Sequence, residues 1–268
     1  MTTASSRDDG AGLSQLAHVT DLLRDRILSG SFRPGARLME VQLSEMLGTS
    51  RTPIRLALSI LEQERLVVAT GPRRGFVVNS FVLNDVFGAI ETRGTLEGMA
   101  ARLCAEQGLT AKAADALHHC IGRGDALLQQ DAIGDEVWGE AWIANNAAFH
   151  ELLVSASGNR AIAIALEPLN RIPLTSASSV VLATDAVAAD RERLRRAQED
   201  HRDILAAIEA GQGSRAEMLL REHALRNIRN KRLNFAEIKS RKAAGAFPGL
   251  SLIDDAAPAS SRNTTKHP

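Results

Sequence analysis

A helix-turn-helix pattern in the first third of the sequence restricts the possible folds more than any other feature. The apolar-periodic segment VQLSEML ends at Gly48, and Ser50 and Pro53 then mark the start of a second helix, because serine is a preferred N-cap and proline fits the first helical turn. The apolar stripe of this second helix consists of Ile54, Ala57, Leu58 and Leu61. Two short helices joined at a glycine are typical of the helix-turn-helix motif, which we predict here.

Two β-rich runs follow the second helix. Leu66–Ala69 and Phe76–Val78 are separated by the turn Thr70–Gly75, which carries Arg73 and Arg74. Short apolar runs rich in valine on either side of a glycine-containing turn are typical of a β-hairpin. We therefore predict that the first domain is a winged helix-turn-helix, in which this hairpin is the wing.

Arg51 and Arg55 indicate a function for this domain. They lie one turn apart at the start of the second helix, on the face opposite its apolar stripe. When such a helix lies in the major groove of DNA, its first residues contact the base edges, and arginine pairs bidentately with guanine. For an arginine pair taken alone a solvated helix face is the alternative, but the surrounding motif favours DNA binding.

The segments LRDRILSGSFRPGARLME, LSEMLGTSRTPIRLALSILEQERLV and PRRGFVV resemble the winged-helix domain of GntR-family bacterial transcription factors, from Asp21 to Val78. The resemblance implies that operator DNA is contacted from the second helix, its flanking residues and the wing. The residues concerned are Arg37, Thr49, Ser50, Arg51, Thr52, Arg55, Arg73, Arg74 and Gly75.

Two residues depart from the family pattern. Leu56 stands where the family usually has Glu, which removes an acidic neighbour that could orient Arg55. Arg65 stands where the family usually has Gly, and it lacks the left-handed freedom of a C-cap glycine.

The length and composition are those of an ordinary globular protein with room for two domains: 268 residues, 44% hydrophobic and 24% charged. The net charge is zero, and residues 1–79 hold 10 Lys and Arg against 8 Asp and Glu, so DNA affinity has to come from local arginines and dimerisation.

Cys104 and Cys120 are too few for a disulfide framework and are predicted to be buried. Without a signal segment or a run of about 18 apolar residues, we expect a cytoplasmic protein with no membrane partner.

Helical periodicity replaces the strand signals after Leu83, and glycines fall near the ends of the periodic segments. The predicted helices are Asn84–Gln107, Thr110–Gln130, Asp135–Ala156, Arg160–Arg171, Asp185–Ala210 and Ser214–Phe235. The predicted fold class is therefore mainly α. We expect a disordered arm at 1–12, the winged helix-turn-helix domain at 13–79, an all-α bundle at 80–238 and a disordered tail at 239–268.

His150, His201 and His223 lie on inward-facing apolar stripes of three separate predicted helices. Burying an unpaired imidazole is costly, so each ring needs a hydrogen-bond partner or a metal. Helical bundles build metal sites from facing helices, and Asn146, four residues before His150, can point at the same ion. Three imidazoles and one oxygen ligand suit Zn²⁺, Ni²⁺ or Mn²⁺. The alternative is a set of separately satisfied core histidines.

The segments NNAAFHELLVSASGN, AQEDHRDILAAIEAG and REHALRNI resemble the FCD effector-binding domain of the FadR subfamily of GntR regulators. In the metal-binding members an Asp or Asn, followed four residues later by His, joins two further histidines. These positions match Asn146, His150, His201 and His223. Asn146 replaces the more usual Asp and removes a negative charge, which lowers the expected cation affinity. In the alternative, the same cluster hydrogen-bonds the effector without a metal.

Arg93 matches an arginine often found on the first FCD helix, and a guanidinium pairs bidentately with a carboxylate. The resemblance thus makes Arg93 a candidate for binding a small carboxylate effector, whereas the alternative is a surface ion pair with Glu97 at i+4. The segment RIPLTSASSVV also resembles regulators of vanillate and other aromatic-acid catabolism, which suggests an aromatic acid.

The leading functional hypothesis is a homodimeric transcription factor, in this family most often a repressor, that a small carboxylate releases from a pseudo-palindromic operator. One alternative is a metal-responsive regulator in which the ion itself is the signal. Another is a metalloenzyme with three histidine ligands, but the sequence has no HExxH pattern and shows no base or nucleophile beside the proposed ligands. We therefore predict that the protein is not an enzyme.

Overall fold

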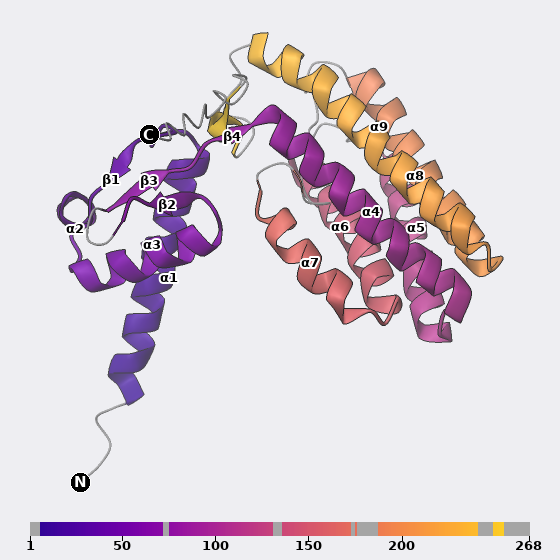
Figure 1. The fold of residues 1–268 in the computed structure, drawn as a ribbon, viewed down its shortest axis with the longest axis horizontal. Coiled ribbons are helices and arrows are strands. Elements are labelled where there is room, and N and C mark those ends of the chain that lie inside the picture. The colour runs from indigo at the N-terminus through magenta and orange to yellow at the C-terminus, as the bar shows by residue number, and fades with distance from the viewer. Residues whose placement is uncertain are drawn as a thin grey trace, which may run out of the picture. The chain divides into compact units, whose positions relative to one another are not determined.

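The computed structural model describes residues 6–71, 75–130, 136–172, 175, 187–240 and 249–254. The chain divides into two compact units: the first contains residues up to Asp85 together with those from Ala244 onward, and the second is Val86–Ala243. Both units are mainly helical, and only the first contains strands in the described part of the chain (Figure 1). The predicted fold class, a winged helix-turn-helix followed by an all-α bundle, is confirmed.

The first unit contains a three-helix arrangement and a small antiparallel sheet. Its helices are α1 (Ser6–Leu28), α2 (Glu40–Leu47) and α3 (Arg51–Gln63), and its sheet consists of β1 (Arg37–Leu38), β2 (Val67–Ala69) and β3 (Phe76–Val78). The strand order is β1-β3-β2, so β2 and β3 form the wing hairpin and β1 pairs with its other edge. The sequence predicted the hairpin but not β1, because a strand of two residues is too short to show an alternation of apolar and polar residues.

Helix α3 is held against α1 by apolar contacts and one ion pair. Leu23 and Ile27 of α1 and Leu58 and Leu61 of α3 are completely buried. Arg24 donates from Nε and Nη2 to the two carboxylate oxygens of Glu64, at 2.9 and 2.7 Å. These contacts fix the position of α3, and therefore of the exposed face that carries Arg51 and Arg55.

The chain leaves α3 through Arg65 in the left-handed conformation. Arg65 has φ +60° and is the one non-glycine residue with positive φ in the described part of the chain. Its carbonyl accepts a bond from the side chain of Asn79 at 2.8 Å, which helps to hold the turn. The geometry that a glycine would supply is therefore kept by an arginine, at a cost of about 1 kcal/mol in backbone strain.

The second unit is a bundle of long helices, as predicted. Its helices are α4 (Leu83–Gln107, whose first turn lies in the first unit), α5 (Ala111–Leu128), α6 (Glu136–Ala156), α7 (Arg160–Asn170), α8 (Val187–Glu209) and α9 (Gly213–Ser240). The core between them includes Phe149, Leu153, Ile204 and Leu220. Both cysteines are buried and free. The largest difference from the predicted ends is at α9, which continues five residues beyond Phe235.

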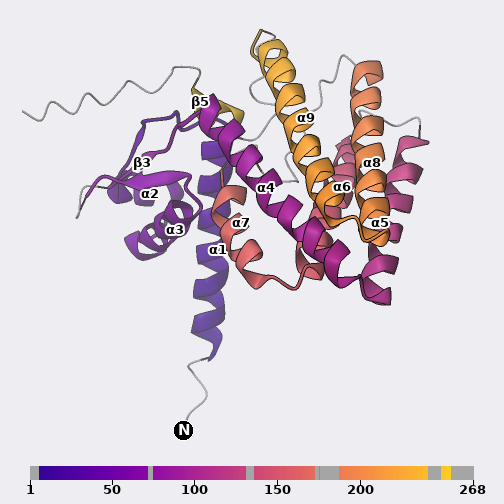
Figure 2. The ribbon, with the colours of Figure 1, turned by 45° about the vertical axis from the view of Figure 1, so that its right-hand side comes forward.

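The two ends of the chain also differ from the prediction. Helix α1 begins at Ser6, inside the segment expected to be a disordered arm. Residues Leu250–Leu252 form a short 3-10 helix, η2, and Ile253–Asp254 form β5, inside the segment expected to be a disordered tail. Strand β5 pairs in parallel with β4 (Phe81–Val82), as Figure 2 shows beside the start of α4. The sequence did not indicate these elements because the described residues of this segment pair with sequence-distant partners and carry no periodicity of their own.

Helices α4 and α9 approach each other closely at two glycines. A Cβ atom built on Gly94 would lie 2.3 Å from the Cβ of Ala224, and one built on Gly98 would lie 3.0 Å from the backbone oxygen of Glu217. Both glycines are therefore required by packing and not by backbone conformation. They bring the backbones of α4 and α9 together at the level of the histidines described below.

Replacing Gly94 by Ala should destabilise the second unit by about 1–3 kcal/mol, because the added methyl overlaps Ala224 and the two helices have to move apart. The matched control is Gly122→Ala on α5, where an added Cβ meets nothing within 4 Å. That change should raise stability by roughly 0.5–1 kcal/mol through helix propensity. Thermal unfolding of both variants measures the difference, and equal midpoints would contradict the close packing.

Candidate DNA-binding surface and histidine site

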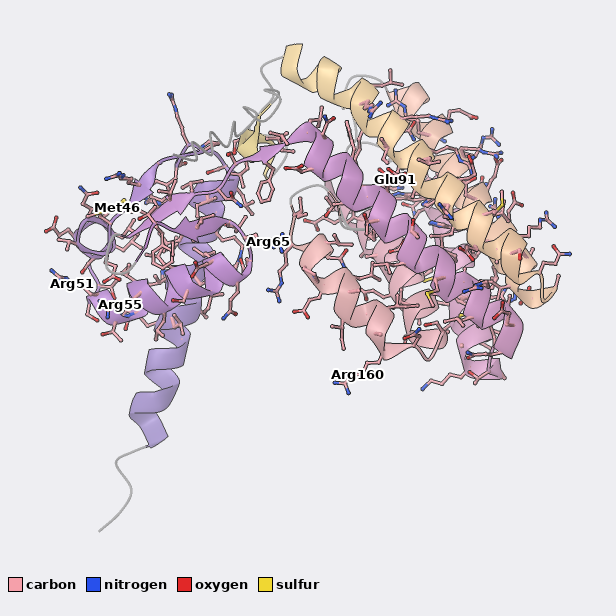
Figure 3. The ribbon with its side chains drawn as sticks, viewed as in Figure 1. Met46, Arg51, Arg55, Arg65, Glu91 and Arg160 are labelled. Atoms are coloured by element: carbon pink, nitrogen blue, oxygen red, sulfur yellow. The ribbon has the colours of Figure 1, made fainter. Side chains whose placement is uncertain are left out.

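The solvent-exposed face of α3, opposite the face that packs in the first unit, carries the predicted DNA-binding side chains. Arg51 and Thr52 are exposed in its first turn, and the Arg55 side chain is 66% exposed one turn later. Figure 3 shows Arg51 and Arg55 on the outer side of α3 near its N-terminal end. Ser50 is the exposed N-cap, and Thr49 before it is half-buried. Four of these five residues are therefore exposed at the start of α3, and the fifth, Thr49, is half-buried and accepts a hydrogen bond from Gln15.

Glu40 holds Arg55 in a defined orientation. The Nε and Nη2 atoms of Arg55 donate to the two carboxylate oxygens of Glu40, at 2.9 and 2.8 Å. The bond from Arg55 lowers the pKa of Glu40, so the pair is charged at neutral pH. The sequence suggested that Leu56 deprives Arg55 of an acidic neighbour on its own helix; α2 supplies one instead, and Leu56 is exposed beside it.

Part of the predicted wing surface is described. Gly75 has φ +82°, and a Cβ there would lie 3.1 Å from the backbone oxygen of Leu38, so glycine is required at this position. Arg37 is exposed on β1, next to β3 in the sheet. The wing residues Arg73 and Arg74 lie outside the described residues, as does most of the segment RIPLTSASSVV.

His150, His201 and His223 come together inside the second unit. They lie on α6, α8 and α9, all three are buried, and their potential ligand nitrogens lie within 4.8 Å of one another. The ring centroids of His201 and His223 are 4.9 Å apart, and His201 stacks on Phe149 at 4.1 Å. Asn146 lies one turn before His150 on α6 and is half-buried. The three inward-facing imidazoles that the sequence singled out therefore form one cluster.

Two buried carboxylates orient two of these imidazoles. Nδ1 of His150 lies 2.9 Å from Oε2 of Glu97 on α4, and Nδ1 of His223 lies 3.1 Å from Oδ2 of Asp200 on α8. Asp200 also accepts two bonds of 2.8 Å from Arg226. A carboxylate on Nδ1 fixes the ring and makes its other nitrogen a better ligand, which is the usual surrounding of metal-binding histidines.

The remaining ring nitrogens fit a metal. Nε2 of His150 and Nε2 of His201 are buried and have no hydrogen-bond partner among the described residues. Burial, with His223 and His150 nearby, lowers the pKa of His201 well below its ordinary value, and burial likewise lowers the pKa of His223. Neutral imidazoles with unused lone pairs are what a divalent ion requires, so the residues fit Zn²⁺, Ni²⁺ or Mn²⁺.

Arg93 lies beside this cluster and is buried. Its Nε is 3.2 Å from Oε1 of Glu97, and its Nη1 donates to the backbone oxygen of Thr175. Burial by itself raises the pKa of Glu97, but Arg93 and His150 outweigh it and hold the pKa at about 2. The Arg93–Glu97 pair expected as the alternative therefore forms, although it is buried and not on the surface. Glu97 contacts both Arg93 and His150, and it therefore links Arg93 to the histidine cluster.

A further buried cation, Lys231, lies on α9 two turns after His223. Burial and the neighbouring Arg93 lower the pKa of Lys231 to about 7. The sequence reasoning missed Glu97 and Asp200 as parts of this site, and it missed Lys231 as a buried cation near Arg93. A single charged residue on a helix is usually solvated, and the one available signal was that Glu97 follows Arg93 by four residues on the same face.

Comparison with known proteins identifies the family. Residues 15–78 match the gntR family of bacterial regulatory proteins, and residues 89–226 match the FCD domain. The chain therefore belongs to the GntR family, and the combination of these two domains is the architecture of the FadR subfamily. This membership places it among transcriptional regulators and not among enzymes.

Individual relatives agree with this assignment. The chain is 34% identical over 148 residues to the HTH-type transcriptional regulator YdhC of Bacillus subtilis (strain 168); the match covers 55% of this chain and 63% of that protein. It is 26% identical over 208 residues to the HTH-type transcriptional repressor GlaR of Escherichia coli (strain K12), covering 77% of this chain and 90% of that protein. The solved structure of Lar from Listeria monocytogenes matches with a TM-score of 0.58 at 17% identity, over 80% of this chain and 96% of that chain, which supports the fold.

None of the described helices is both long enough and apolar enough to span a bilayer.

Lys231→Met should raise the free energy of unfolding at pH 7. It should also abolish the rise of that free energy between about pH 7 and pH 10 that the buried lysine causes. The pKa of Lys231 is about 7 in the folded protein against an ordinary value of 10.5, so between these values the unfolded chain binds more protons and stability rises with pH. The variant should lose this rise. Denaturant unfolding at pH 7 and pH 9.5 measures it, with Lys112→Met, at an exposed lysine of α5, as the control that keeps it. A wild-type stability that does not change over this range would contradict the lowered pKa of Lys231.

Proposed function

We propose that the protein is a cytoplasmic, homodimeric transcriptional repressor that binds a pseudo-palindromic operator through two copies of α3. The observation that supports this most directly is the exposed face of α3, where Arg51, Thr52 and Arg55 project from a helix packed firmly on α1. Since a two-fold dimer presents the same surface twice, it requires an operator with two related half-sites. The similarity to the repressor GlaR supports the direction of regulation.

We further propose that a divalent ion is held by His150, His201 and His223, with Asn146 as the oxygen ligand. This rests on the unpartnered buried Nε2 atoms and on the carboxylates that orient the rings. When bound, the ion supplies positive charge and coordination positions that an anionic ligand can occupy. A nitrogen and oxygen ligand set does not by itself select one of Zn²⁺, Ni²⁺ and Mn²⁺.

The effector in this proposal is a small carboxylate, in the simplest case an aromatic acid. Arg93 is buried beside Glu97, which contacts His150, so its guanidinium lies close to the histidine cluster and can pair with the carboxylate of a small acid. The effector can release the operator only if it binds the released state more tightly than the DNA-bound state. Arg93 is suited to this, because Glu97 and an incoming carboxylate compete for its guanidinium.

The second candidate is a regulator for which the ion itself is the signal. It is favoured by the same cluster, because three buried imidazoles form a ligand set without any organic molecule. Titrating Zn²⁺, Ni²⁺ or Mn²⁺ into the protein–operator complex, with and without an aromatic acid, separates the two. Release by the ion alone supports the second candidate, and release that requires the acid supports the first.

Arg51→Ala should weaken operator binding by about 1–3 kcal/mol, because it removes a side chain placed to contact base edges. Arg160→Ala, at an exposed arginine of the second unit that Figure 3 labels, is the matched control with the same loss of charge and should bind normally. Fluorescence anisotropy with an operator selected from random DNA measures both. Wild-type affinity in Arg51→Ala would remove this residue from the base-reading set.

His201→Ala should abolish metal binding and leave operator binding by the metal-free protein nearly unchanged, since α3 lies in the other unit. The matched control is His118→Ala, because His118 is exposed on α5 and its side chain contacts Glu209. Elemental analysis of the purified proteins gives the metal content. The same metal content in His201→Ala and wild type would refute the assigned site.

A further inference from the structure

Leu56 is a large apolar side chain on the solvent-exposed face of α3. It is 49% exposed, whereas the apolar stripe on the other side of the helix is buried. A single exposed leucine is common on protein surfaces and requires no function. The position of Leu56 is what distinguishes it, because it is the sixth residue of a helix whose first residues are the proposed operator contacts.

The exposed face of α3 carries two rows of side chains. Arg51 and Arg55 lie one turn apart and form a cationic row, which Figure 3 shows on the outer side of the helix. Thr52 and Leu56 also lie one turn apart, and they form an uncharged row beside it, since each directly follows one of the arginines. Because residues i and i+4 of a helix share a face, a surface that contacts Thr52 is also within reach of Leu56.

The contact between Arg55 and α2 leaves Leu56 uncovered. Nε and Nη2 of Arg55 donate to the two carboxylate oxygens of Glu40, at 2.9 and 2.8 Å. The guanidinium is therefore held toward Glu40, and about half of the surface of Leu56 stays in contact with solvent. This apolar surface is available to whatever binds the outer face of α3.

The chemistry of the major groove indicates which group Leu56 contacts there. The base edges in this groove present hydrogen-bond donors and acceptors, and thymine adds an apolar 5-methyl group. A leucine side chain has no donor or acceptor, so it cannot replace the water that a polar base edge loses. Contact with a thymine methyl instead removes apolar surface of both partners from water. The uncharged row thus suits thymine, as the cationic row suits guanine.

We propose that Leu56 is a further specificity-determining residue of α3, which packs on the 5-methyl group of one thymine in each operator half-site. The proposal rests on the proposed function, because it assumes that α3 lies in the major groove of an operator. It adds an apolar contact to the arginine contacts and assigns it to one chemical group of one base. Removing a methyl group from such a contact corresponds to about a fourfold loss of affinity.

The test replaces the thymines in one half-site of the selected operator, one at a time, by deoxyuridine, which keeps the base pair and lacks only the methyl group. Fluorescence anisotropy then gives the affinity for each operator. Wild type should lose about fourfold at one position, and Leu56→Ala should lose less than about 1.5-fold at that position. Alanine favours a helix, so α3 stays folded in this variant.

Two control variants separate the methyl contact from a general effect on the first unit. Leu56→Met keeps a large apolar side chain at the same place and should retain the loss at that thymine. Val68→Ala removes apolar surface from another residue that is 49% exposed, on β2 and not on α3, and should respond to deoxyuridine as wild type does.

Two results overturn the methyl contact and leave the proposed function intact. One is sequence-selective operator binding by wild type without a loss at any deoxyuridine position. The other is a loss that Leu56→Ala retains in full; if the oligomeric state of this variant also changes, Leu56 belongs to a contact between copies of the chain. If wild type shows no sequence-selective DNA binding at all, the proposed function fails, and the methyl contact fails with it.

Discussion

The burial of three imidazoles in a helical bundle is the constraint on which the second unit depends. A buried polar ring without a partner is costly, so the bundle has to supply carboxylates at defined places. Glu97 of α4 and Asp200 of α8 meet this need for His150 and His223. His201 has no comparable partner on Nε2 among the described residues. The positions of four helices are thereby tied to one small group of nitrogens, which is why this group is the natural place for a ligand to act.

Two of these helices, α4 and α9, pack tightly against each other beside the histidine site. Gly94 and Gly98 let α4 approach α9 closely, so a ligand that alters Arg93, Glu97 or His223 acts on two tightly packed helices.

Most of the secondary structure could be predicted from the sequence, because helical periodicity and glycine positions are local signals. The helix-turn-helix, the wing hairpin and the helices of the second unit followed from such signals. Strands β1, β4 and β5 did not, since two-residue strands are defined only by their partners. Glu97, Asp200 and Lys231 were missed for a related reason: the cost of burying a charge becomes visible only when the surrounding helices are in place.

The sequence by itself determined the exposed arginine face of α3 and the inward-facing position of each of the three histidines, because each is a periodic pattern within one helix. It also indicated two domains, because helical periodicity replaces the strand signals after Leu83. The tertiary structure decided which carboxylate faces which imidazole, that Glu40 of α2 holds Arg55, and that the C-terminal segment returns to pair with β4. These contacts join residues far apart in the chain. Only packing, in which buried polar groups and strand edges must find partners, can determine such pairings.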